Sequence, residues 1–95
     1  MQVRDVFISG TGLVQLVVRG NTVETGQFIP ISDMSEAEIL GSQFAADGGI
    51  PDTRVIITND DIIVLQLTFP DGSVVFVVIH KATGTMTTID DPEGP

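Results

Sequence analysis

The apolar positions are most concentrated in the second half of the chain. Residues 61–80 read DIIVLQLTFPDGSVVFVVIH, in which two runs of β-branched and large apolar side chains flank a short polar segment. That segment, residues 70–73, combines a proline that presets φ, an aspartate that can accept backbone hydrogen bonds and a glycine that tolerates positive φ. The pattern predicts a β-hairpin with strands over residues 61–69 and 73–80.

The first third of the chain predicts a three-stranded antiparallel meander. Strands are expected over residues 3–9, 13–19 and 22–29, the last ending at Pro30. The reversals between them fall at residues 10–12 and 20–21, where glycines permit short hairpin loops.

A change of period after Asp33 predicts one helix. Ser35 is followed three residues later by Glu38, which is the spacing of a capping box, and Met34 is placed to pack on Ile39 as a hydrophobic staple. The helix is expected to end near Ala46, before the glycines of the next segment. The face expected to pack on the sheet consists of Ala37, Leu40, Gly41 and Phe44.

The rest of the chain predicts two further strands and a tail. Residues 54–58 and 85–89 are expected to be strands, with a two-residue turn at Asn59-Asp60 that uses positive φ, and a reversal at residues 81–84. Residues 90–95 are expected to form an acidic, frayed tail. The resulting fold is a single α+β domain over residues 1–89. It has one antiparallel sheet of six or seven strands in the order βββ-α-ββββ, with the helix packed on one face.

The two central strands are apolar on both faces, which raises the question of what covers them. Ile63, Leu65 and Leu67 alternate with Ile62 and Val64, so neither face of this strand is polar throughout. Strands of this kind need cover on both sides, and one short helix can supply one of them. We expect the N-terminal meander to fold over the second face as a sandwich or half-barrel. A second copy of the chain is the alternative.

Composition and charge exclude several classes of function. Thirteen acidic residues against four basic ones give a net charge of −9, which argues against nucleic acid or an anionic membrane as a direct partner. Cysteine is absent, so disulfides, thiolate metal sites and cysteine nucleophiles are excluded. No apolar stretch is long enough for a membrane helix, and the N-terminus lacks the pattern of a secretory signal. A cytoplasmic location is expected.

Three motifs suggest chemistry, and each has a simpler structural interpretation. His80, the single histidine, could act with Asp90 or Asp91, but it ends an apolar strand with no nucleophile motif beside it. Residues 9–12 (SGTG) resemble part of a phosphate-binding loop but open a strand instead of a helix. The acidic clusters at residues 59–61 and 90–93 lack the ligand spacing of an EF-hand. No cofactor and no metal site is predicted.

The expected function is therefore non-enzymatic binding of another protein, as an accessory subunit, regulator or inhibitor. One alternative is an acidic inhibitor of phage or mobile-element type that occupies a basic nucleic-acid-binding groove on its target. A second is a small enzyme that uses His80 with Asp90 or Asp91. The residues expected to contact a basic partner are Asp33, Glu36, Asp47, Asp52, Asp60 and Asp61.

Overall fold

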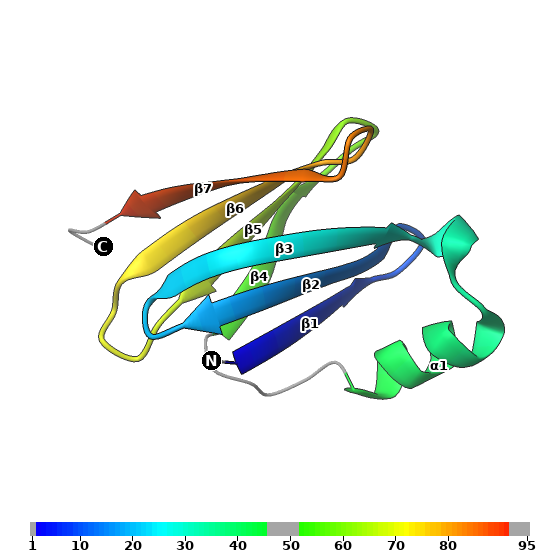
Figure 1. Ribbon diagram of the computed structural model, residues 1–95, viewed down its shortest axis with the longest axis horizontal. Coiled ribbons are helices and arrows are strands. Elements are labelled where there is room, and N and C mark those ends of the chain that lie inside the picture. The colour runs from blue at the N-terminus through cyan, green and yellow to red at the C-terminus, as the bar shows by residue number, and fades with distance from the viewer. Residues whose placement is uncertain (1, 46–51, 92–95) are drawn as a thin grey trace.

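The strands form two antiparallel sheets that pack face to face (Figure 1). The computed structural model describes residues 2–45 and 52–91, the side chains of residues 43–45 and 91 excepted. Along the chain the elements are β1 (Gln2–Ile8), β2 (Gly12–Arg19), β3 (Thr22–Pro30), the 3₁₀ turn η1 (Ile31–Asp33), α1 (Glu36–Ala45), β4 (Asp52–Thr58), β5 (Ile62–Thr68), β6 (Val74–His80) and β7 (Thr85–Asp91). One sheet has the order β1-β2-β3 and the other β4-β5-β6-β7. The α+β class holds in a broad sense, since the protein is mostly strand with one short helix, but the expected single sheet is two.

The core lies between the two sheets. Alternate side chains of β2, β5 and β6 point into it, as the two-residue period of a strand requires. The buried cluster consists of Val14, Leu16, Val18, Ile63, Leu65, Leu67, Phe69, Val75, Val77 and Ile79. The expectation that the N-terminal strands cover one face of the central hairpin is therefore confirmed. This also explains why there are two sheets: stacking the meander on the hairpin buries the inner apolar face of each sheet, which edge-to-edge pairing could not do.

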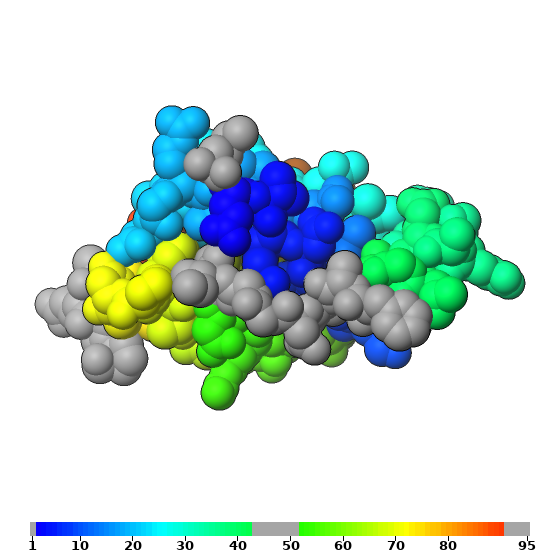
Figure 2. Space-filling view, turned by 90° about the horizontal axis from the view of Figure 1, so that it is seen from below, coloured from blue at the N-terminus to red at the C-terminus, as the bar shows by residue number. Residues whose placement is uncertain are grey.

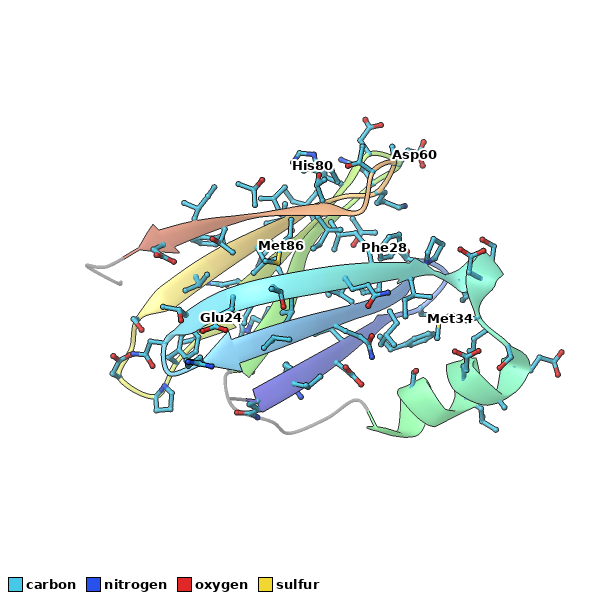
Figure 3. All side chains as sticks on the ribbon, in the orientation of Figure 1. Glu24, Phe28, Met34, Asp60, His80 and Met86 are labelled. Carbon is cyan, nitrogen blue, oxygen red and sulfur yellow. The ribbon has the colours of Figure 1, made fainter. Side chains whose placement is uncertain are left out.

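The edges of the two sheets lie close together on both sides of the sandwich. On one side the Arg4 side chain donates a 3.5 Å hydrogen bond to the Thr53 hydroxyl, which joins β1 to β4. Figure 2 shows β1 in blue and β4 in green along this side. On the other side, a Cβ added to Gly26 in β3 would overlap the Met86 sulfur of β7. Met86 reaches between these strands (Figure 3), and the absence of a side chain at Gly26 makes room for it.

The helix begins as predicted but packs elsewhere. The Ser35 amide donates to Glu38 Oε1 at 3.1 Å, and the Glu38 amide donates to Ser35 Oγ at 3.2 Å, so the capping box is confirmed. However, α1 contacts β1 and lies beside that edge strand, not across a sheet face (Figure 1). Three of the four residues of the predicted packing face are exposed, namely Leu40 at 54%, Ala37 and Gly41, so this prediction is wrong for them. The side chain of Phe44 lies outside the described residues. The meander covers one face of the central hairpin as expected, but α1 does not lie on the other.

Two local expectations for the second half are also corrected. Asn59 does not need positive φ, and no non-glycine residue among the described ones has it. Instead the Asn59 side-chain oxygen accepts the amides of Asp61 and Ile62 at 2.8 and 2.9 Å, which satisfies the turn without left-handed backbone. β7 continues to Asp91, two residues into the expected tail, because its ladder with β6 runs on to Val74. Residues 92–95 lie outside the described residues.

A hydrogen-bonded cluster joins the two sheets at the β5–β6 turn. Asp71 accepts hydrogen bonds from the amide and hydroxyl of Ser73, at 2.9 and 2.7 Å, inside that turn. Asn21, in the β2–β3 turn of the other sheet, donates from its side-chain amide to Asp71 and to Ser73. These donors, the Ser73 hydroxyl first and the Ser73 amide next, lower the pKa of the Asp71 carboxyl.

The lowered pKa makes the contribution of Asp71 to stability depend on pH. The ionised carboxylate stabilises the fold above the unfolded-state pKa of about 4, and this contribution is lost as pH falls through the lower folded-state pKa. Asp71→Asn should therefore lower the urea midpoint at neutral pH. The gap between variant and wild type should stay constant above the unfolded-state pKa and close as pH falls through the folded-state pKa of Asp71, where its carboxylate becomes protonated. A gap that widened in acid would contradict the assignment.

Candidate binding surfaces

The strand register separates His80 from the acids suggested as its partners. His80 stands opposite Ile62 on β5 and Thr85 on β7, at one end of the β6–β7 ladder. Asp90 stands opposite Val75, five residues away along β6, which is about 17 Å at the rise of a strand. Asp91 is one residue farther still. His80 therefore forms no dyad with either aspartate in this structure, and its side chain is exposed near the tips of the hairpins (Figure 3).

The acids expected to face a basic partner divide between the two ends of the sandwich. Asp60 and Asp61 lie in the β4–β5 turn, and Asp33 is in η1, which approaches the same end. Glu36 follows η1 as the first residue of α1. Asp52 begins β4, about 20 Å from the β4–β5 turn along that strand. Asp47 lies outside the described residues, so the structure places four of the six toward one end and one at the other.

A hollow of about 390 Å³ opens at the end of the sandwich that carries Asp60. It is lined by Gly10, Thr11, Phe28, Pro30, Ile31, Ser32, Asp60, Lys81 and Ala82. The Lys81 ammonium donates to the Asn59 carbonyl oxygen at 3.1 Å, so part of its hydrogen-bonding capacity is used within the fold. The rim of this hollow carries the Lys81 ammonium, the Asp60 carboxylate and the hydroxyls of Thr11 and Ser32. Such groups can hold a small polar molecule, but they do not select one chemical class of molecule.

The outward side of the β4–β7 sheet carries a cluster of apolar side chains, interrupted by a few polar ones. Because Ile63, Leu65, Val75 and Val77 point into the core, the residues between them point outward. The register aligns these outward residues in two adjacent rows across the four strands, which we call the outer face. The rows are Ile57, Val64, Val78, Thr87 and Arg54, Gln66, Phe76, Ile89.

The ends of the two rows are the most exposed part of the outer face. Ile57 is 44% and Ile89 55% exposed, whereas Val64, Phe76 and Val78 are half-buried between their cross-strand neighbours. Arg54 is the one formally charged residue in the two rows, and its Nε lies 4.0 Å from Asp52. Both side chains of that ion pair are largely exposed, so it adds little to stability.

The outward side of the β1–β3 sheet differs in chemistry. Its central row is Asp5, Gln15 and Gln27, which is polar across all three strands. A hollow of about 340 Å³ lies over Gln15 and Gln27 of this row and over Val3, Val17 and Thr25 of the next. The central row of this surface is thus polar and holds a carboxylate, whereas the two central rows of the outer face are mainly apolar and hold none.

The chain matches no protein-family model, no curated protein and no solved structure. Within the described ranges, no three histidine, aspartate or glutamate side chains gather closely enough to hold a metal ion. No helix in the same ranges has the length and apolar character needed to cross a membrane. Any function of the outer face must therefore be argued from its own residues.

Sequence reasoning found only part of the outer face. The two-sided apolar character of residues 62–69 and 74–79 was visible, and it includes Val64, Phe76 and Val78. Ile57 and Ile89 were not singled out, because each belongs to a flanking strand whose register the sequence does not state. The signal that could have found them is one isoleucine at an outward position in each edge strand, extending the apolar rows.

Proposed function

We propose that this protein is a protein-binding module whose partner docks on the outer face. The observation that supports this is the cluster of five apolar side chains in the two rows, most exposed at Ile57 and Ile89, in rows that hold no carboxylate. Contiguous exposed apolar surface on a water-soluble fold marks an interaction site more often than scattered apolar residues do. Burying apolar surface favours association, and the loss of translational, rotational and side-chain freedom opposes it.

The chemistry of the outer face also specifies what kind of surface the partner presents. Phe76 is the largest side chain of the rows and stands beside Gln66 on the neighbouring strand, so it is the natural anchor for a partner pocket. Arg54 lies at the rim, on edge strand β4. A matching surface is apolar and close to uncharged, as expected for an accessory subunit or regulator. Binding through it should change little with salt, whereas occupation of a basic groove would weaken steeply.

A site-specific crosslinker tests the proposal. A photo-reactive amino acid placed at Gln66, in the centre of the outer face, should give a discrete adduct in the cells that make the protein. The same group at Gln27, in the polar row of the other sheet, is the matched control and should give none. Ile89→Lys should abolish the Gln66 adduct, because it puts a charge into the apolar contact. Val3→Lys should leave it unchanged, although Val3 is equally exposed at 61%.

Two outcomes would count against a partner on the outer face. One is adduct formation from Gln27 as readily as from Gln66. The other is an adduct from Gln66 that survives Ile89→Lys but disappears at high salt, which would indicate contact through the acidic turns.

A further inference from the structure

We propose that Met86 is an oxidation site, and that conversion of its thioether to the sulfoxide reversibly loosens the seam between β3 and β7. The oxidant is a hydroperoxide such as hydrogen peroxide. Three properties of Met86 carry the proposal: how far it is exposed, what its sulfur touches, and which strands its side chain joins.

Met86 is the methionine of the described residues that a small oxidant reaches more easily. The chain has three methionines, of which Met1 lies outside the described residues. Met34 is buried, with 9% of its surface exposed, whereas Met86 is half-buried. Oxidation requires contact between the sulfur and the peroxide, so its rate follows exposure. Met86 should therefore react before Met34.

The Met86 sulfur lies in an apolar contact between the two sheets. Met86 pairs with Ile79 in the β6–β7 register and packs against the buried core. Its sulfur lies over Gly26 of β3, where an added Cβ would overlap it and would also come within 3.1 Å of a Leu16 methyl group. A thioether suits this place because it is apolar, flexible and polarisable.

Oxidation changes this contact in two ways. A sulfur lone pair attacks one peroxide oxygen and the O–O bond breaks, so that the sulfur gains an oxygen and hydrogen peroxide is reduced to water. The sulfoxide oxygen is a hydrogen-bond acceptor, and its burial among apolar neighbours costs free energy. It also needs volume, although the space over Gly26 is already filled by the unoxidised side chain. Both effects favour withdrawal of the Met86 side chain from the seam.

Withdrawal of Met86 loosens one side of the sandwich and leaves its other connections intact. β3 and β7 are edge strands of their sheets, and the Met86 side chain reaches from one to the other (Figure 3). On the opposite side, β1 and β4 are joined by the hydrogen bond from Arg4 to Thr53, which peroxide does not alter. The hydrogen bond from Asn21 to Asp71 is equally resistant. The oxidised protein should therefore stay folded, with a local opening between β3 and β7.

The sulfoxide can be removed again without any thiol of this chain. Methionine sulfoxide reductases reduce it to the thioether, one enzyme for each epimer at sulfur. Because the chain contains no cysteine, no thiol of its own competes for the peroxide and no disulfide can follow. The state of the seam thus depends on the balance between peroxide and reductase.

Peroxide treatment of the purified full chain tests the proposal. Trypsin places Met34 and Met86 in different peptides, since Arg54 and Lys81 lie between them, and mass spectrometry should show sulfoxide forming several-fold faster at Met86. The melting midpoint by circular dichroism should fall by about 5–10 °C. Amide exchange should accelerate in β3 and β7 more than in β5. Treatment with reductases for both epimers should restore the midpoint.

Leucine variants show which methionine is responsible. Leucine keeps an apolar side chain of similar volume and has no sulfur to oxidise. Peroxide should leave the midpoint of Met86→Leu unchanged and lower that of Met34→Leu as in the wild type, each compared with its own untreated sample. Met86→Gln, which introduces a polar group of similar size, should lower the midpoint without peroxide.

Three results would overturn the oxidation site: equal rates at Met34 and Met86, an unchanged midpoint in wild type oxidised at Met86, or a fall in peroxide-treated Met86→Leu. A midpoint that the reductases do not restore would overturn its reversibility.

Discussion

Replacing Leu65 with alanine is expected to lower the free energy of unfolding by about 3 kcal/mol. Leu65 is fully buried in the middle of β5, with Val77 as its neighbour on β6, and it faces the β2 side chains across the core. Truncation removes apolar contacts and leaves a cavity that two rigid sheets cannot easily close. A domain of this length has a total stability of about 5–14 kcal/mol, so the loss is a large fraction of it.

Leu40→Ala is the matched control for that change. Leu40 lies on α1 and is 54% exposed, so the same truncation there should cost less than about 0.5 kcal/mol. The chain has no tryptophan or tyrosine, so urea unfolding is best followed by far-ultraviolet circular dichroism. Equal losses for the two variants would mean that the core does not lie between the sheets.

The features predicted correctly from the sequence are those that a few neighbouring residues decide. The β5–β6 turn has Gly72 at a φ of +90°, and its amide donates to the Phe69 carbonyl at 2.9 Å. The Ser35 and Glu38 pair forms its capping box within four residues. In both cases the backbone groups that need hydrogen bonds and the side chains that supply them are adjacent in the chain, so no knowledge of the rest of the fold is required.

The features predicted wrongly depend on which distant surfaces meet. An apolar stripe on α1 indicates that a helix can pack, but it does not say against what. Here β2 covers the inner face of the central hairpin, whereas α1 lies by β1 instead of on the outer face, and Leu40 is exposed. Likewise, strand pairing and strand stacking both bury apolar side chains, so alternation alone could not decide between one sheet and two.

The outer face could be predicted from the sequence only in part. The apolar outward positions of the central hairpin, such as Phe76, follow from alternation. Their extension to Ile57 and Ile89 requires the registers of β4 and β7. The positions of the acids also depend on the fold, since Asp52 and Asp60 are near in the chain but lie toward opposite ends of β4. The two ends of a strand are separated by the full length of the strand, so residues that are near in the sequence can lie far apart in space.

Gly12→Ala should destabilise the fold by about 3 kcal/mol, because two separate constraints act on this residue. Gly12 has a φ of +148°, which side-chain-bearing residues rarely adopt, and an added Cβ would overlap the Ile29 carbonyl oxygen. It would also lie 3.1 Å from the Ile31 amide nitrogen, which is held in place by its hydrogen bond to the Thr11 carbonyl at 2.9 Å. Since these atoms are backbone, relief requires β3 or η1 to move.

Gly10→Ala separates the two constraints. Gly10 also has positive φ, at +75°, but a Cβ there would meet no atom within 4 Å. In Gly10→Ala the backbone conformation alone should lower the free energy of unfolding by about 1 kcal/mol. The additional loss in Gly12→Ala then measures the steric cost of the close approach of β2 to the β3–η1 junction. Urea unfolding gives both values, and similar losses for the two variants would contradict that approach. The larger loss at Gly12 should bring reduced amide protection at Ile31, because the displaced junction carries the hydrogen bond to Thr11.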